Sequence, residues 1–134
     1  MMRHIDHIAI AVHSIQDSLT LYRDTLGMRL QDIEDVPDQK VKTAVLKSGD
    51  DRIELVEPTA PDSPVSKFLA ARGGGIHHVA VRVPDLEAAI ADCLAKGLRM
   101  IDTAPRPGAG RARIAFIHPK STGGVLIELT ERPA

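Results

Sequence analysis

The two halves of this 134-residue chain share one sequence pattern. The segment IDHIAIAVHSIQDSLTLYRDTLGMRL, from Ile5, aligns with IHHVAVRVPDLEAAIADCLAKGLRMI, from Ile76, and His7 falls on His78. Each half also closes with a similar run, RIELVE around Glu54 in the first and VLIELTE around Glu128 in the second. A repeat of this length predicts two copies of one structural unit. We therefore expect an α+β fold made of paired βαβββ modules.

The modules are predicted to cover residues 1–60 and 74–134 of a single domain. The stretch between them, PTAPDSPVSKFLAARGGG, begins with prolines and ends with glycines, which is typical of a connection. Within it, Ser63 can cap a short helix that opens with Pro64. A short helical linker is therefore expected between the modules.

Hydrophobic periodicity predicts the individual elements. Alternating apolar residues predict strands at 6–12, 28–36, 42–46, 53–57, 76–83, 113–117 and 125–130 and, more weakly, at 99–102. Apolar residues spaced by three or four predict helices at 15–25 and 86–96. Ser14 with Asp17 has the spacing of a capping box and Asp85 can cap the second helix, while Gly27 and Gly97 end the two helices.

The first strand of each module places a histidine beside alanines. Because side chains alternate between the faces of a strand, His7 shares a face with Ala9 and Ala11, and His78 shares one with Ala80. Small residues around a polar one leave space unfilled. This pattern indicates a cavity.

The closing strands add one carboxylate each, Glu54 and Glu128, opposite the apolar residues that flank them. If the faces converge, two imidazoles and two carboxylates surround one point, and carboxylates buried there need a compensating cation. Mixed nitrogen and oxygen ligands suit a first-row divalent ion better than calcium. A single histidine is more often a core residue and a single strand glutamate more often faces solvent. Their recurrence at matching places in both modules favours a metal site.

The composition excludes several other functions. Seventeen basic and eighteen acidic residues argue against a broad nucleic-acid footprint or an electrostatic membrane anchor. The few aromatic residues, Tyr22, Phe68 and Phe116, offer no stacking platform for single strands. Cys93 is expected to be a buried core residue, and no disulfide framework is expected. The amino terminus resembles neither a signal peptide nor a spanning segment, so a cytoplasmic location is expected.

The sequence resembles the vicinal-oxygen-chelate superfamily, which includes glyoxalases and bleomycin resistance proteins, and within it the methylmalonyl-CoA epimerase family. The segments GGGIHHVAV and HPKSTGGVLIEL carry this resemblance most specifically, together with IDHIAIAV, VPDQKVKTAVL and RIELVEPT. The resemblance implies a curved sheet around a metal cup. It implies metal ligands at His7, His78 and Glu128, with Glu54 at a position where some members have glutamine. Cobalt is the expected ion, with manganese, nickel or zinc as alternatives.

The resemblance further implies an enzyme of propionate metabolism, a homodimer with an acyl-CoA substrate. Its reaction is epimerisation of (R)- and (S)-methylmalonyl-CoA through a metal-stabilised enolate. Some members carry a glutamate, proposed as a catalytic base, where this chain has Thr43. We therefore hypothesise that Glu128 and Glu54 are the two bases; a role for both as ligands only, with water or the region of Gln39 completing the chemistry, is the alternative.

The expected substrate-binding residues are Lys120, Ser121 and Gln39. Two other functions remain open at this point. One is a glyoxalase-type lyase acting on a glutathione hemithioacetal, and the other is a non-catalytic small-molecule-binding protein of the same fold. The complete set of histidines and glutamates counts against the second.

Overall fold

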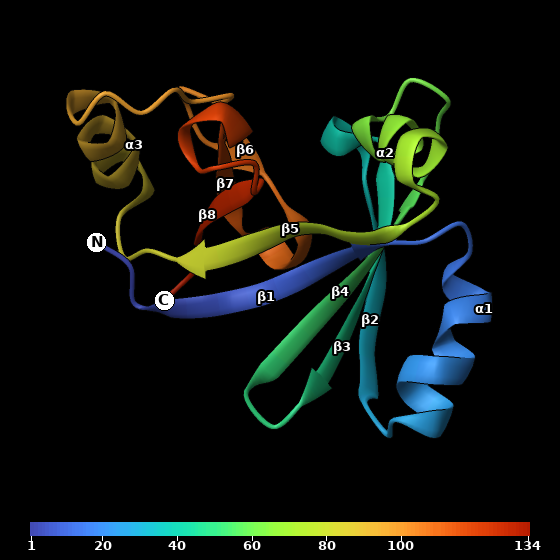
Figure 1. The fold of residues 1–134 in the computed structure, drawn as a ribbon. Coiled ribbons are helices and arrows are strands. Elements are labelled where there is room, and N and C mark those ends of the chain that lie inside the picture. Colours follow the sequence, from blue (N-terminus) through green and yellow to red (C-terminus); the bar gives the residue numbers. More distant parts are fainter. The chain divides into compact units, whose positions relative to one another are not determined.

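In a computed structural model that describes residues 1–134, the order of elements repeats (Figure 1). The first set is β1 (His4–Ala11), α1 (Ile15–Leu19), β2 (Arg29–Val36), β3 (Val41–Ser48) and β4 (Asp51–Pro58). The second set is β5 (Gly75–Arg82), α3 (Leu86–Ala95), β6 (Arg106–Pro107), β7 (Arg113–Ile117) and β8 (Ile127–Glu131). Helix α2 (Pro64–Arg72) lies between them. The predicted pair of βαβββ modules is confirmed.

The chain folds as two compact units. The N-terminal unit is His7–His77, and the C-terminal unit combines Met1–Asp6 with His78–Ala134. Strand β1 therefore leaves the C-terminal unit after Asp6, and β5 returns to it at His78.

The N-terminal unit contains strands in the order β2-β3-β4-β1. Strand β1 runs parallel to β4, and the other pairs are antiparallel. Helix α1 covers one face of this sheet, where Ile15 and Leu19 are buried against the side chains of Ala44, Leu46 and Leu55. The opposite face carries His7 and Glu54, as strand alternation requires.

Helix α1 is shorter than predicted. Its N-cap is Ser14, whose side chain accepts from the Asp17 backbone N–H at 3.2 Å. Beyond Leu19 the chain continues as the π-helical turn η1 (Thr20–Thr25), and the Leu26 N–H donates to the Leu21 carbonyl five residues earlier. Gly27 ends the segment in the left-handed region, with a φ of 81°, as predicted.

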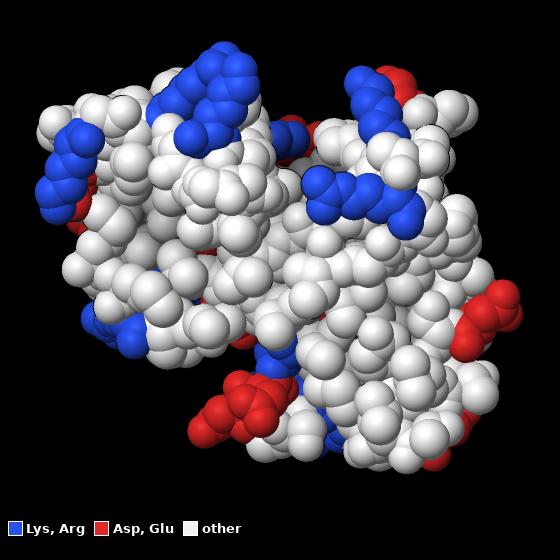
Figure 2. All heavy atoms as spheres, in the orientation of Figure 1, with Lys and Arg blue, Asp and Glu red and all other residues white.

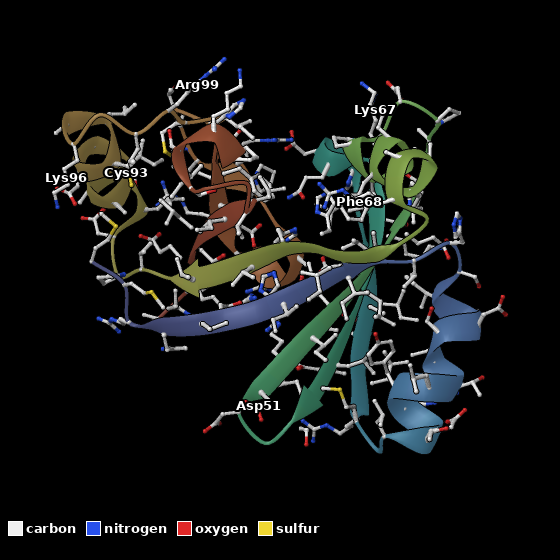
Figure 3. All side chains as sticks on the ribbon, viewed as in Figure 1. Asp51, Lys67, Phe68, Cys93, Lys96 and Arg99 are labelled. Atoms are coloured by element: carbon white, nitrogen blue, oxygen red, sulfur yellow. The ribbon has the colours of Figure 1, made fainter.

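The helix predicted to open with Pro64 is confirmed as α2. Ser63 is fully buried, and its hydroxyl accepts from the Val65 backbone N–H at 3.2 Å. On this helix Phe68, labelled in Figure 3, makes an edge-to-face contact with the His77 ring at 5.1 Å. His77 is thus a packing residue of the N-terminal unit.

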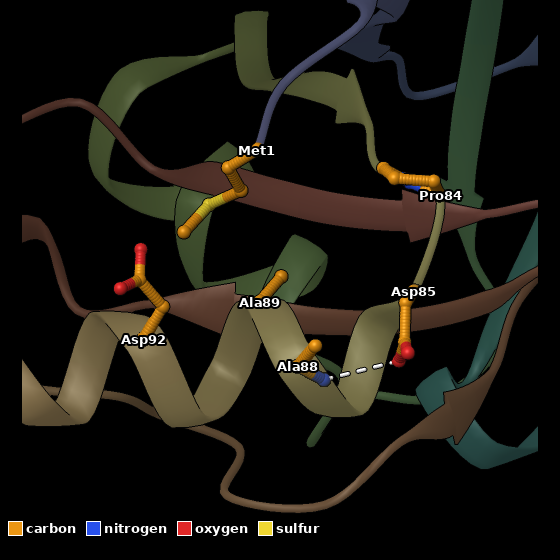
Figure 4. Close-up of a pocket in the computed structure, with 6 residues that line it drawn as sticks. All are labelled: Met1, Pro84, Asp85, Ala88, Ala89 and Asp92. Carbon is orange, nitrogen blue, oxygen red and sulfur yellow. Dashed lines mark hydrogen bonds between the residues drawn. The ribbon is translucent and has the colours of Figure 1, made fainter.

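The C-terminal unit repeats this construction with strands in the order β5-β8-β7-β6 and α3 on one face. Asp85 caps α3 by accepting from the Ala88 backbone N–H at 3.1 Å (Figure 4). Ile90 and Cys93 of this helix are buried in the core with Ala115 and Leu129. Cys93 is a core residue, as predicted (Figure 3).

A glutamate from the closing strand binds the start of the helix in each module. The side chain of Glu57 accepts from the Ile15 backbone N–H at 2.8 Å, and that of Glu131 accepts from the Leu86 backbone N–H at 3.0 Å. Both N–H groups belong to a first helical turn, which has no partner within its helix. The final glutamate of each repeated closing run therefore has a structural role.

The predicted strand at 99–102 is wrong. Met100 makes only an isolated bridge to Ile117, and the edge strand β6 forms later, at Arg106–Pro107. The cause is Asp102, whose carboxylate accepts from the Phe116 backbone N–H at 2.9 Å. A side chain thus occupies the donor that a longer strand would use.

No helix has the length and apolar character needed to span a membrane. On the face shown in Figure 2, basic and acidic side chains form small separate groups among uncharged atoms.

A pocket of about 260 Å³ lies beside the start of α3. It is lined by Met1, Pro84, Asp85, Ala88, Ala89 and Asp92 (Figure 4). It lies on the helix side of the sheet, away from the face that carries His78 and Glu128.

Candidate functional site

A histidine and a glutamate lie together inside the N-terminal unit. His7 of β1 and Glu54 of β4 are 4% and 5% exposed, and His7 Nδ1 lies 3.4 Å from Glu54 Oε2. The parallel pairing of the two strands sets Ala9 directly beside Glu54. Since Ala9 has almost no side chain, the glutamate can turn toward the histidine two residues earlier.

Arg52 holds the same carboxylate. Its Nε donates to Glu54 Oε2 at 2.9 Å, and its side chain is only 14% exposed. Arg52 and Glu54 are two residues apart on β4 and so share one face of the sheet. One oxygen of Glu54 is therefore engaged by both His7 and Arg52.

The C-terminal unit contains the matching pair. His78 of β5 and Glu128 of β8 are 6% and 4% exposed, and His78 Nε2 lies 3.5 Å from Glu128 Oε2. Ala80 lies directly beside Glu128, as Ala9 does beside Glu54. The repeat in the sequence thus produces the same local arrangement twice.

The partners of the two carboxylates differ between the units. Thr130, fully buried, donates its hydroxyl to Glu128 Oε2 at 3.2 Å, whereas Glu54 has the guanidinium of Arg52. The His78 ring packs edge-on against Phe116 at 5.2 Å. Glu128 accordingly has a neutral hydrogen-bond donor where Glu54 has a cation.

The donor chemistry fits a first-row divalent ion. Each unit presents a buried imidazole nitrogen beside a buried carboxylate oxygen, and such ions prefer this nitrogen and oxygen set. Burial of the Glu128 carboxylate, whose Thr130 partner is neutral, also favours a cation as an additional partner.

The three predicted substrate-binding residues lie in short turns. Gln39 is half-buried in the turn η2 (Pro37–Gln39), and its backbone carbonyl accepts from the Ser63 hydroxyl at 3.5 Å. Lys120 and Ser121 belong to the turn η4 (Pro119–Ser121), between β7 and β8. Lys120 is exposed, whereas the Ser121 hydroxyl accepts from the Arg99 backbone N–H at 2.8 Å.

The turn η4 depends on a histidine. His118 Nδ1 accepts from the Lys120 backbone N–H at 3.1 Å. Partial desolvation, with the positive charges of Arg99 and Lys120, lowers the pKa of His118. The imidazole therefore keeps an acceptor nitrogen for the turn at neutral pH.

Sequence reasoning missed Arg52, Thr130 and His118. The first two stand two residues from a predicted ligand glutamate, on the same strand and face. An i, i+2 search for hydrogen-bond donors around each glutamate would have found them. His118 precedes Pro119 at the start of the turn, a position from which a side chain can cap.

The family comparison matches this arrangement. A family model described as the glyoxalase/bleomycin resistance protein/dioxygenase superfamily matches residues 6–116. The chain belongs to this superfamily. The region matched includes β1, β4 and β5, which carry three of the four predicted ligands.

Relatives of this superfamily member include the uncharacterized protein YqjC of Bacillus subtilis, 42% identical over 97% of this chain and 93% of the relative. The ethylmalonyl-CoA/methylmalonyl-CoA epimerase of Cereibacter sphaeroides is 34% identical over 98% of this chain and 99% of the relative. A solved methylmalonyl-CoA epimerase in complex with methylmalonyl-CoA and NH4+ is similar with a TM-score of 0.96 and 39% identity, covering 100% of this chain and 97% of that one. The predicted resemblance to the methylmalonyl-CoA epimerase family is confirmed.

Proposed function

We propose that this superfamily member is an isomerase that interconverts (R)- and (S)-methylmalonyl-CoA with one bound divalent ion. Relatives named for this activity match along nearly the whole chain. The structural observation that carries the proposal is the buried histidine–glutamate pair that each unit builds.

The proposed ligands of the single ion are His7, Glu54, His78 and Glu128. Cobalt is the first choice, and manganese, nickel and zinc are the alternatives, because the donor set suits all of these ions. Such an ion would act as a Lewis acid that stabilises negative charge on the substrate oxygens. The protein's own part is to orient the thioester and to move a proton.

Glu128 is proposed as one proton-transfer group. Its hydrogen bond from Thr130 orients the carboxylate without placing a cation on it. Glu54 is the symmetry-related candidate for the second group. Its contacts with Arg52 and His7 hold one of its oxygens, which supports a ligand role at least as well as a role in proton transfer.

We propose that Lys120, Ser121 and Gln39 contact the acyl-CoA. An exposed ammonium group on Lys120 can pair with phosphate, and the two turns offer backbone and side-chain donors. The remaining proposals are that the enzyme is a homodimer and that it acts in the cytoplasm in propionate metabolism.

The decisive experiment is epimerisation of methylmalonyl-CoA by protein stripped with a chelator and then loaded with each metal in turn. We expect turnover with cobalt and loss of turnover after chelation. A glutathione hemithioacetal serves as the competing substrate. Turnover of the hemithioacetal alone would instead support a lyase, and the absence of any turnover with any metal would support a binding protein.

Solvent deuterium wash-in at the substrate α-carbon tests the two carboxylates. Glu128→Gln and Glu54→Gln proteins that retain metal are compared with the parent protein. Full exchange in both variants would remove both residues as bases.

A further inference from the structure

The site-facing side of the N-terminal sheet carries one more carboxylate, that of Glu34 on β2. Strand β2 pairs with β3 so that Glu34 lies directly opposite Thr43, and Thr43 lies opposite Val56 of β4. Val45, on the same strand as Thr43, lies opposite Glu54. Since paired residues of adjacent strands point to the same side of a sheet, Glu34 shares the side of Glu54.

The other side of the sheet confirms this orientation. Ile33, next to Glu34, packs with Ala44 and Leu55 in the cluster under α1. Glu34 must therefore point away from α1. It is half-buried, whereas the following residue of β2, Asp35, is exposed.

The side chains between Glu34 and Glu54 are small and uncharged. Thr43, Val45 and Val56 occupy this part of the face, and a threonine hydroxyl does not accept protons near neutral pH. Asp32 shares the side of Glu34, but its side chain is exposed, whereas that of Glu34 is half-buried. Glu34 is therefore the carboxylate best placed to serve the stretch of the face around Thr43.

Inversion at an α-carbon by a two-base mechanism uses one proton-transfer group on each side of that carbon. Glu128 is proposed for one side. Glu54, the candidate for the other, has one oxygen fixed by Arg52 and His7. Glu34 has the chemistry for this role and lies on a different strand from the ligands.

We propose that Glu34 is a catalytic residue that exchanges a proton with the α-carbon, so that Glu54 remains a ligand; this inference rests on the proposed function. In one direction the Glu34 carboxylate accepts the α-proton, and the electron pair of the broken C–H bond moves into the thioester carbonyl to form an enolate. A proton from the opposite side then forms the new C–H bond as the electron pair returns. The opposite epimer reacts by the reverse sequence, in which protonated Glu34 donates.

The test is Glu34→Gln protein, loaded with cobalt and assayed in D2O with each epimer separately. We expect interconversion to fall by about 100-fold or more, in the range lost with a general base. For the epimer whose α-hydrogen faces Glu34, exchange of that hydrogen with solvent should fall by the same factor as interconversion. The other epimer should still exchange its α-hydrogen but should not invert. Loss of both exchanges together, with loss of cobalt, would show a structural role and overturn the proposal.

Asp35→Asn is the matched control. It removes the same charge from the next residue of the same strand, on the opposite side of the sheet, and should leave both exchanges within about twofold, as expected for an exposed residue outside the site. Cobalt content, measured by elemental analysis, should stay the same in Glu34→Gln and fall in His7→Ala, which removes a proposed ligand. Glu34→Asp, which restores a shorter carboxylate, should recover part of the lost exchange.

The outcomes separate this inference from the proposed function. An active parent protein with a fully active Glu34→Gln variant would overturn the role of Glu34 alone. A parent protein that exchanges neither epimer with any metal would overturn both.

Discussion

Asp6 links the amino terminus to the C-terminal unit through buried charges. Its side chain is fully buried, and Arg82 Nε and Arg132 Nε both donate to its Oδ1 at 2.9 Å. Arg132 Nη2 donates to Oδ2 at 2.8 Å. One carboxylate thus pairs with two guanidinium groups that lie far from it in sequence.

Asp6→Asn should lower the free energy of unfolding by about 3–5 kcal/mol, because it leaves two partly buried guanidinium groups without their anion. Urea unfolding followed by circular dichroism measures this loss. Asp24→Asn, which removes an exposed partner of Arg23, is the control and should leave the unfolding midpoint unchanged. Equal effects of the two substitutions would contradict a special role for Asp6.

Arg52 and Glu54 should behave as one unit in stability measurements. Removal of either partner leaves a buried charge uncompensated, whereas Arg52→Gln with Glu54→Gln leaves a neutral pair. We expect the double variant to lose roughly 1–3 kcal/mol less free energy of unfolding than the two single variants lose together. The measurement is made in chelator so that no metal contributes. Simple additivity would show that the contact at 2.9 Å contributes nothing to stability.

At the scale of elements, α3 packs by placing Cys93 in the core. Cys93 is 3% exposed, and desolvation, with the charge of Asp92, raises the pKa of its thiol. A raised pKa means that the folded state binds the thiol proton more tightly than the unfolded state. The contribution of this group to stability is therefore complete below the ordinary thiol pKa and is lost as the pH rises through the raised value.

Native protein at pH 8 should react with a thiol reagent about 100-fold more slowly than urea-unfolded protein, because the reagent needs an exposed thiolate. Cys93 is the only cysteine in the sequence, so Cys93→Ser protein supplies the background rate. Rapid labelling of the native protein would mean that α3 opens readily.

For the whole molecule, the proposed ion would join ligands from both units. Cobalt at 100 times its dissociation constant would add about 2.7 kcal/mol to the free energy of unfolding. His7→Ala and His78→Ala, one in each unit, should both reduce the thermal shift caused by cobalt. His13 is exposed, so the His13→Ala protein should keep the full thermal shift. A shift lost with only one of the two ligand variants would show that one unit alone binds the ion.

The amino-acid sequence by itself predicted most of the elements. The repeat predicted both βαβββ modules, and local signals predicted the caps at Ser14, Ser63 and Asp85. Such features follow from the chain itself, because alternation, helical spacing and capping depend on residues only a few positions apart. The pairing of His7 with Glu54 and of His78 with Glu128 is observed, while their common ion stays a prediction.

Only the tertiary structure decided which distant groups meet. The failed strand at 99–102 depends on a hydrogen bond between Asp102 and Phe116, fourteen residues away. Asp6 binds Arg132, which is 126 residues away in the sequence. Glu34 lies beside Thr43 only because of the register between β2 and β3. These contacts arise because strand pairing brings together residues that no local spacing relates, and their register is set by the packing of the whole sheet.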